Sequence, residues 1–242
     1  MIPIRDLNVS RTTPWVTWTI ILACSLVFVF QAVQPAWLQR EIMIQNALIP
    51  ARLTRALGEP FDGYAVLSVF TSMFMHGGLL HIIGNAWFLR LFGDNVEDNF
   101  GHARYVLFYL LCGAFAAATQ WAVNPNSTVP MVGASGAIAG VLAAYVVLYP
   151  RARVVTLVPI VVFFTMVELP AFVVIGLWFV LQFFSGVASL GVNQGGGVAF
   201  WAHIGGFGAG LVLTFLLRRK PPTPASHALP FMVGHVDESW RS

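Results

Sequence analysis

Long apolar stretches that are almost free of charge dominate the sequence. No Asp, Glu, Lys or Arg occurs from Tyr105 to Pro150, and Glu168 is the only one from Val154 to Leu217. A helix needs ~20 predominantly apolar residues to cross a bilayer, and it satisfies its own backbone groups there. The sequence therefore predicts an all-α, polytopic membrane protein. The six transmembrane helices that we predict cover about residues 15–33, 78–92, 104–123, 131–149, 169–187 and 198–217.

Segment 154–167 is the ambiguous part of this pattern. Its apolar run contains Pro159 and could be a separate span, an extension of the fifth helix or an interfacial segment. A separate crossing would give seven spans and would place His203 on the opposite side of the membrane from Ser135. We therefore favour six spans, with the segment as an interfacial stretch or as part of the fifth helix.

Basic residues in the short loops predict the orientation of the chain, because such residues are enriched on the cytoplasmic side. Arg151 and Arg153 follow the fourth predicted helix, and a basic cluster at 218–220 follows the sixth. We therefore expect both termini to lie in the cytoplasm, and we expect the membrane to be a bacterial inner membrane. We divide the chain into a cytoplasmic N-terminus (1–14), a six-helix domain (15–218, with a long outer-surface loop at about 34–77) and a disordered cytoplasmic tail (219–242).

Composition supports a membrane protein and argues against other classes. The chain is 57% hydrophobic and 10% charged, with a mean hydropathy of +0.76. Its net charge of +3 comes from loops and termini, and no basic patch interleaved with aromatic residues indicates a nucleic-acid partner. We expect membrane lipid to surround the apolar helices. Cys24 and Cys112 lie in apolar segments and are expected to be buried thiols.

A serine and a histidine lie inside the predicted membrane region. Ser135 is about five residues into the fourth predicted helix and His203 about five into the sixth, so both should lie roughly 8 Å below the outer surface. Polar residues inside a membrane are candidates for function. A serine needs a base to become a nucleophile, and no acidic residue is expected near this pair. The sequence therefore predicts a Ser–His dyad.

Further polar groups lie in the same outer half of the bundle, where the second predicted helix begins. His81 and Asn85 are four residues apart and share a helix face, and His76 precedes them. With Gly133 and the Ser135 backbone N–H, they are candidates for stabilising the negative charge that develops on a carbonyl oxygen during acyl transfer.

Two alternatives apply to these residues. Small residues allow membrane helices to approach closely, so Ser135 and His203 could lie on packing faces. We assign that packing role to Gly136, Gly140, Gly206 and Gly210. The three histidines could also hold a metal, but their spacing is not H-E-x-x-H and no carboxylate is expected nearby. We therefore predict neither a metal nor another cofactor.

Together these residues resemble the rhomboid family of intramembrane serine proteases. The matching positions are Phe74-Met75-His76, His81 and Asn85; Gly93, Glu97, Gly101 and Arg104; Gly133-Ala134-Ser135-Gly136; and Ala202-His203-Ile204-Gly205-Gly206 with Gly210. The resemblance implies a six-helix bundle in which Ser135 is the nucleophile and His203 the base, assisted by His81 and Asn85. It also implies single-span transmembrane proteins as substrates, cleaved through an acyl-enzyme.

The sequence departs from the family pattern in two places. Ala139 stands where members often place an aromatic ring that supports the histidine, so another ring would have to substitute. A Trp-Arg pair that some members carry in the long first loop is also absent.

The glycine-rich stretch Gly191–Gly197 is a candidate lid or a simple connector. A catalytically silent protein that binds membrane helices is the alternative function; a transporter would need charged midplane residues that the chain lacks.

Overall fold

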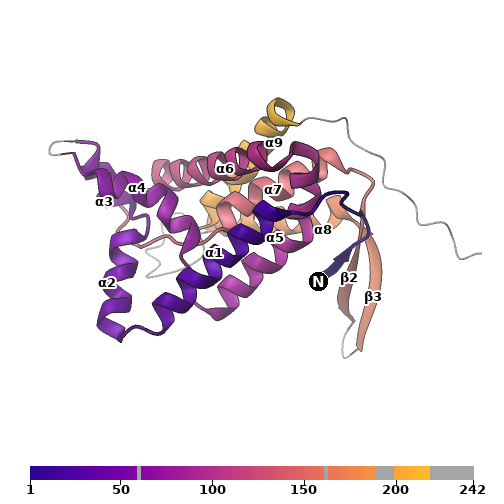
Figure 1. Ribbon diagram of the computed structural model, residues 1–242, viewed down its shortest axis with the longest axis horizontal. Helices are drawn as coiled ribbons and strands as arrows, with labels where there is room; N and C mark the ends of the chain where they lie inside the picture. The colour runs from indigo at the N-terminus through magenta and orange to yellow at the C-terminus, as the bar shows by residue number, and fades with distance from the viewer. Residues whose placement is uncertain (59–60, 161–162, 189–198, 219–242) are drawn as a thin grey trace, which may run out of the picture.

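The computed structural model describes residues 1–58, 61–160, 163–188 and 199–218 (Figure 1). Helices form most of this part of the chain, and three strands form a small sheet. In chain order the elements are β1 (Ile2–Asp6), α1 (Trp15–Ala32), α2 (Ala36–Asn46), α3 (Pro50–Ala56), α4 (Gly63–Thr71), the 3₁₀ helix η1 (Ser72–Phe74), α5 (Leu79–Phe100), α6 (His102–Val123), α7 (Ser135–Leu148), β2 (Arg153–Ile160), β3 (Phe163–Pro170), α8 (Ala171–Ala188) and α9 (Phe200–Leu217).

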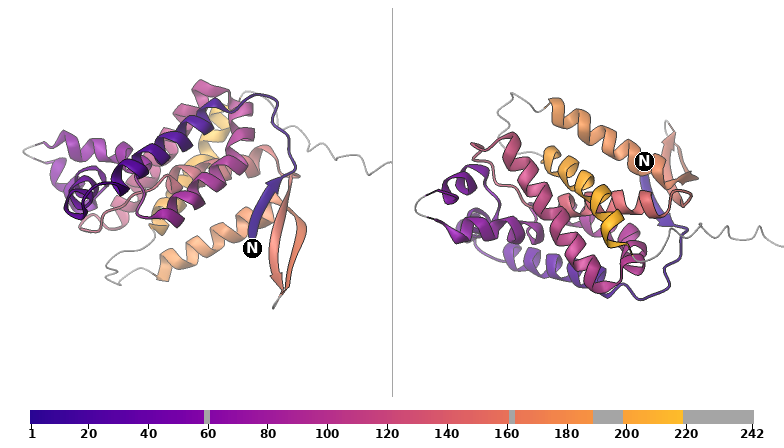
Figure 2. Two further views of the ribbon diagram at one scale, coloured as in Figure 1. Left: turned by 60° about the horizontal axis from the view of Figure 1, so that its bottom comes forward. Right: turned by 90° about the horizontal axis from the view of Figure 1, so that it is seen from above.

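Helix α7 lies at the centre of the bundle, surrounded by α5, α6, α8 and α9 (Figures 1 and 2). Apart from Ser135, Val146 and Val147, every residue of α7 is buried. A helix that is apolar on all sides is stable only when other elements cover it completely. This burial fixes the position of the helix that begins with Ser135.

Four glycines bring α7 and α9 into direct backbone contact. A Cβ atom on Gly206 would collide with the carbonyl oxygen of Gly136, and one on Gly210 with that of Gly140. On the other side of α7, a Cβ on Gly136 would lie 2.6 Å from the Cβ of Ala116 in α6. The close approach of these helices therefore depends on the absence of side chains at the four positions.

A buried carboxylate joins α1 to α5. The Glu97 side chain is fully buried and accepts hydrogen bonds from the backbone N–H groups of Val16 (2.9 Å) and Thr17 (2.8 Å). It also accepts one from the Thr17 hydroxyl at 2.7 Å and lies 2.6 Å from Nδ1 of His102. The first N–H groups of a helix have no partner within the helix, so a carboxylate placed there stabilises its start.

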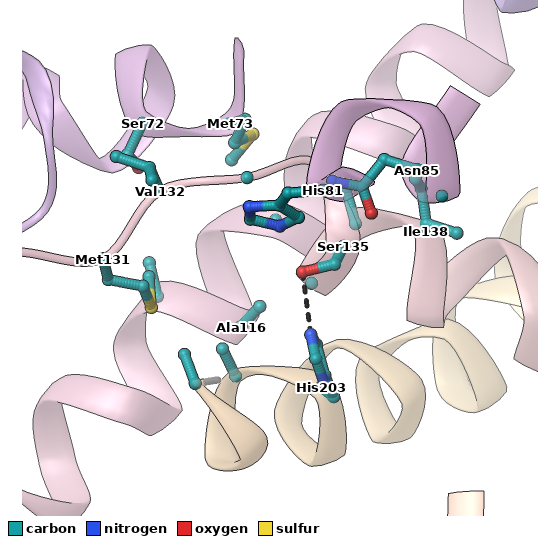
Figure 3. A pocket seen from close by; sticks show the side chains of 18 of the residues that line it. Ser72, Met73, His81, Asn85, Ala116, Met131, Val132, Ser135, Ile138 and His203 are labelled. Atoms are coloured by element: carbon teal, nitrogen blue, oxygen red, sulfur yellow. Dashed lines mark hydrogen bonds between the residues drawn. The ribbon is translucent and has the colours of Figure 1, made fainter. Parts of the chain in front are cut away.

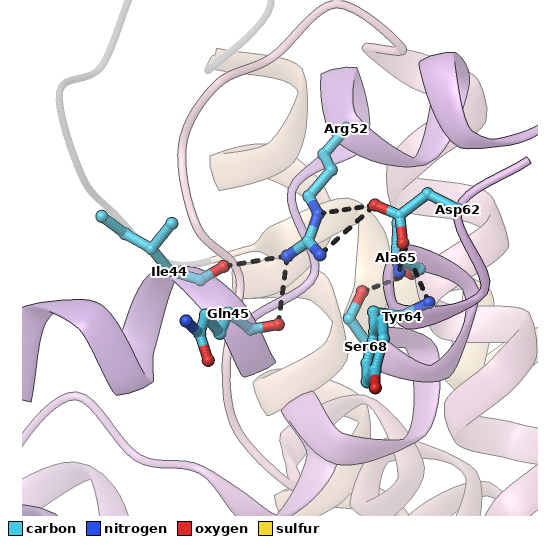
Figure 4. Close-up of polar contacts among 7 residues, drawn as sticks. All are labelled: Ile44, Gln45, Arg52, Asp62, Tyr64, Ala65 and Ser68. Atoms are coloured by element: carbon cyan, nitrogen blue, oxygen red, sulfur yellow. Dashed lines mark hydrogen bonds and ion pairs between the residues drawn. The ribbon is translucent and has the colours of Figure 1, made fainter. Parts of the chain in front are cut away.

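The connection between α1 and α5 carries the short helices α2, α3 and α4, and Arg52 ties it together (Figure 4). The Arg52 guanidinium donates to the carbonyl oxygens of Ile44 (3.3 Å) and Gln45 (3.1 Å) and lies 3.3 Å from the Asp62 carboxylate. Asp62 also caps α4, and its pKa is lowered by the hydrogen bond from the backbone N–H of Ala65 and by Arg52. These contacts hold α2, α3 and α4 to one another within the connection.

The expectation of an all-α fold is wrong at one end of the bundle. The described residues of segment 154–167, namely 154–160 and 163–167, belong to the antiparallel pair β2–β3, with Arg153 opposite Pro170 and Ile160 opposite Phe163. Strand β1 pairs with β2 and gives the order β1-β2-β3, and the sheet lies beside α8 (Figures 1 and 2). The fifth helix therefore begins only at Ala171, after a hairpin that returns the chain to the side from which it came.

Three described helices are long and apolar enough to cross a membrane, namely α1, α6 and α9. The pair α4–η1 and α5, bent by 76°, makes a fourth if it is counted as one span, and α7 and the part Ala171–Ser185 of α8 are shorter apolar stretches. A mostly helical membrane fold is thus confirmed, while the count of six spans stays a prediction. The second predicted span continues to Phe100. The tail 219–242 and the stretch Gly191–Gly197 lie outside the described residues.

Candidate active site

Ser135 is the first residue of α7, so the prediction that it lies about five residues inside a helix is wrong. The chain before it is held in place by backbone hydrogen bonds to its neighbours. Met131 and Leu48 exchange two backbone hydrogen bonds of 2.8 and 3.0 Å, and the N–H of Gly133 donates to the carbonyl of Ser72 at 2.9 Å. A residue that opens a helix keeps a backbone N–H without a partner in that helix. Ser135 therefore offers such an N–H together with its hydroxyl.

Gly133 has a backbone conformation that favours glycine, with φ of 125°. A Cβ atom at this position would also lie 2.7 Å from Nε2 of His81 and 3.5 Å from Nδ2 of Asn85. Residues other than glycine rarely adopt such a φ, because their Cβ atom crowds the backbone. The glycine thus lets the chain turn into α7 and leaves room for His81.

His203 lies in the first turn of α9, and its Nε2 is 2.7 Å from the Ser135 Oγ (Figure 3). The His203 side chain is almost completely buried, at 5% exposure. In neutral imidazole one nitrogen carries a proton and the other accepts a hydrogen bond. An unprotonated Nε2 in this position accepts the hydrogen bond from the serine hydroxyl, which is the geometry that a general base requires.

The other ring nitrogen of His203 faces helix α8. Nδ1 is 2.7 Å from Oε1 of Gln182, and the indole of Trp178 packs at a tilt of 42°, with its ring centroid 5.6 Å from that of the imidazole. Trp178 is thus a ring that contacts His203, whereas Ala139 provides none. Sequence reasoning did not identify Gln182; its signal was an amide one turn after a Trp in an otherwise apolar segment.

His81 and Asn85 both come from α5, as the spacing predicted, and line the same cavity as Ser135 and His203. Asn85 Nδ2 is 2.9 Å from Nε2 of His76. The His76 side chain is 2% exposed, and its ring meets that of His81 edge to face at 5.2 Å. His76 therefore lies behind the other two residues and contacts Asn85.

The cavity has a volume of about 580 Å³. Figure 3 shows Ser135 between His203 and the pair formed by His81 and Asn85. The remaining lining is mostly apolar and includes Met131, Val132 and Trp178. A space of this size, apolar apart from a few converging polar groups, is typical of a binding site for part of a substrate.

The described acidic residues do not supply a third member for the pair. Glu168 lies on β3, where its exposed carboxylate is 3.5 Å from the Arg153 guanidinium, and no hydrogen bond joins it to the site. The alternative that the three histidines hold a metal is not favoured either, because two of the imidazoles direct Nε2 at other side chains. Nε2 of His203 faces Ser135, and Nε2 of His76 faces Asn85.

Comparison with known proteins identifies the family. Residues 64–220 match the Rhomboid domain. RHOMBOID-like protein 4 of Arabidopsis thaliana is 30% identical over 66% of this chain and 35% of its own length. RHOMBOID-like protein 5 of the same plant is 27% identical over 75% of the chain and 54% of its own length. The Bacillus subtilis Rhomboid protease GluP is 35% identical over 34% of the chain and 16% of its own length.

The chain thus spans about a third to a half of the first two relatives named, and a smaller part of the third. The domain match covers well over half of the chain and includes Ser135, His203, His81 and Asn85. The apolar helices described above are those of an integral membrane protein. This chain belongs to the rhomboid family.

Proposed function

We propose that the protein is an intramembrane serine endopeptidase that uses Ser135 as nucleophile and His203 as general base. The observation that carries this proposal is the 2.7 Å contact between Oγ of Ser135 and Nε2 of His203 at the wall of the cavity. The match to the Rhomboid domain and the similarity to a relative named as a protease support it.

The reaction would proceed in two steps. Oγ of Ser135 attacks the carbonyl carbon of the scissile peptide bond while Nε2 of His203 takes the hydroxyl proton. The C–N bond then breaks, His203 returns the proton to the departing amine, and an ester remains on Ser135. Water, activated by the same imidazole, releases the second product.

Negative charge on the substrate oxygen needs donors during both steps. The candidates are the Asn85 amide, an imidazole N–H of His81 and the backbone N–H of Ser135. Gly133 keeps the space in front of His81 open, and His76 holds the Asn85 amide from behind. We assign a supporting role to His76 because it is buried and bonded to Asn85.

Single-span transmembrane proteins are the substrates that we propose. The carbonyl groups of a helix are bonded and shielded, so a substrate must unwind locally before Ser135 can attack it. The proposed entry lies between α5 and α8, which supply the cavity-lining residues Asn85 and Trp178. In this proposal membrane lipid surrounds the protein, and both termini face the cytoplasm of a bacterial cell. The reaction needs no cofactor, and the protein has no nucleic-acid partner.

Reconstitution into vesicles with a panel of single-span proteins tests this function. The wild-type protein should convert at least one of them into two fragments cut within or near the span, and Ser135→Ala should leave all of them intact. Fragments that form equally with Ser135→Ala would refute the proposal. Tight binding without cleavage by the wild type would favour a silent helix-binding protein.

A further inference from the structure

Helix α8 provides His203 with two contacts from the same helical face. Trp178 and Gln182 are four residues apart, so their side chains lie one turn from each other. The indole packs against the imidazole at 5.6 Å, and the amide oxygen Oε1 lies 2.7 Å from Nδ1. Both ring nitrogens of His203 are thereby engaged, one by Gln182 and the other by Ser135.

We propose that Gln182 is a positioning residue that holds His203 in the tautomer and orientation needed for general-base catalysis; this inference rests on the proposed function. An amide oxygen can only accept a hydrogen bond, so Nδ1 must carry the proton. Nε2 then presents its lone pair to the hydroxyl of Ser135. Gln182 takes the orienting place that a carboxylate holds in a Ser–His–Asp triad.

The surroundings of the site explain why an amide is suited to this place. An ionised carboxylate loses favourable hydration when it leaves water, and this is costly unless the carboxylate is paired. Gln182 is partly buried in an apolar helix. A neutral amide oxygen orients the imidazole there without that cost. Its partial negative charge keeps a proton on Nδ1 while Nε2 takes a second proton from the Ser135 hydroxyl.

The position of the base and its orientation depend on different helices. The glycine contacts described above fix α9 against α7, and with it the distance from His203 to Ser135. Helix α8 lacks such contacts at Gly176, where an added Cβ would meet nothing within 4 Å, and its side chains Leu177, Leu181 and Phe184 are exposed. A displacement of α8 would therefore separate Gln182 from His203 and leave the dyad distance unchanged. The full rate of catalysis thus depends on the contact between α8 and His203.

Substitutions at Gln182 test this role through the rate at which a fluorophosphonate modifies Ser135. Gln182→Met keeps the length of the side chain and removes the acceptor, so the rate should fall about 10-fold, as expected for the loss of one hydrogen bond to the base. Gln182→Glu keeps an acceptor oxygen at the same reach, so its rate should fall less than that of Gln182→Met. Leu181→Ala, on the exposed side of the same helix, is the control and should not change the rate.

Nitrogen NMR of ¹⁵N-histidine-labelled protein gives a readout that does not depend on activity. The His203 signals, identified by their loss in His203→Ala, should show the proton on Nδ1 in the wild type and a shift towards Nε2 in Gln182→Met. A wild-type His203 protonated on Nε2 would overturn the proposal even if Gln182→Met failed to fold. So would a labelling rate and tautomer unchanged in Gln182→Met. Wild-type protein with the expected tautomer but no labelling would instead refute the proposed protease function.

Discussion

Gly133 is a position at which even one added methyl group should disturb the site. Gly133→Ala places a Cβ at a φ of 125° and 2.7 Å from Nε2 of His81, so either the turn into α7 or the imidazole must move. Backbone strain of this kind costs of order 1–3 kcal/mol, and we expect fluorophosphonate labelling of Ser135 to fall at least ~10-fold.

Gly176→Ala is the matched control for this prediction. An added Cβ at Gly176 meets no atom within 4 Å, so labelling should stay at the wild-type rate. Equal labelling of Gly133→Ala and Gly176→Ala would show that the conformation at Gly133 is not needed for the site.

The residues that the sequence identified are those whose polarity stands out in a charge-free stretch. Ser135 and His203 could be paired because each lies near the start of an apolar segment on the same predicted side of the membrane. Gln182 could not be assigned in the same way. Its partner is 21 residues further along the chain, and only the packing of α8 against α9 brings the two together.

At the scale of elements, the contact between α7 and α9 is the one on which the dyad depends. Gly206→Ala introduces a Cβ that collides with the carbonyl oxygen of Gly136, and overpacking of this kind costs typically 1–3 kcal/mol. We expect a lower midpoint of thermal unfolding in detergent and a loss of labelling, since Ser135 and His203 move apart.

Gly208→Ala provides the comparison on the same helix. It adds the same methyl group where no atom lies within 4 Å, and replacing Gly by Ala in a helix favours the helix by roughly 0.5–1 kcal/mol. Its unfolding midpoint should equal or exceed that of the wild type. If both variants lost stability to the same degree, close helix contact would not be the reason.

The attachment of β1 to the bundle should depend on pH. Asp6 accepts a hydrogen bond from Asn95 at 2.9 Å, and burial raises its pKa from 3.8 to about 7, with Asp94 adding to the effect. A raised carboxyl pKa means that docking favours the protonated form. Docking should therefore be strongest below about pH 4 and should weaken as the pH rises through about 7.

Hydrogen exchange of the β1 amides, expressed as protection factors, measures this docking. Protection should fall between about pH 4 and 7 in the wild type, the interval between the ordinary pKa of Asp6 and its raised value, and should stay level in Asp6→Asn. Protection that rises with pH in the wild type would contradict the assignment.

The strands also show where the sequence pattern reaches its limit. Segment 154–167 begins with Val154, Val155 and Thr156, β-branched residues that favour strands, but a short apolar run looks alike in a strand and in a buried helix. The partner strand β1 is about 150 residues away, so no local pattern indicates the pairing. The helices α1, α6 and α9 were predictable because their apolar runs are long.

For the molecule as a whole, the β2–β3 hairpin bears on the path of the chain through the membrane. Its two ends, Arg153 and Pro170, lie opposite each other, so these strands lead the chain out and back, and the six crossings stay a prediction. With six crossings, the exposed positions Asn126 and Arg151 lie on opposite sides, Asn126 outside and Arg151 inside. The native thiols Cys24 and Cys112 are buried and should react little.

Cysteine labelling can test this arrangement. Asn126→Cys should react with a membrane-impermeant maleimide in intact cells, and Arg151→Cys only after the membrane has been opened. Reaction of Arg151→Cys in intact cells would reverse the predicted orientation. Reaction of both would contradict the number of crossings between them.

The central claim is that His203 activates Ser135, and fluorophosphonate labelling of the purified protein tests it most directly, with mass spectrometry to locate the adduct. Wild-type protein should carry the adduct on Ser135, in the presence or absence of a chelator, and Ser135→Ala and His203→Ala should carry none. Folded wild-type protein that does not react, or an adduct that persists in Ser135→Ala, would contradict the account.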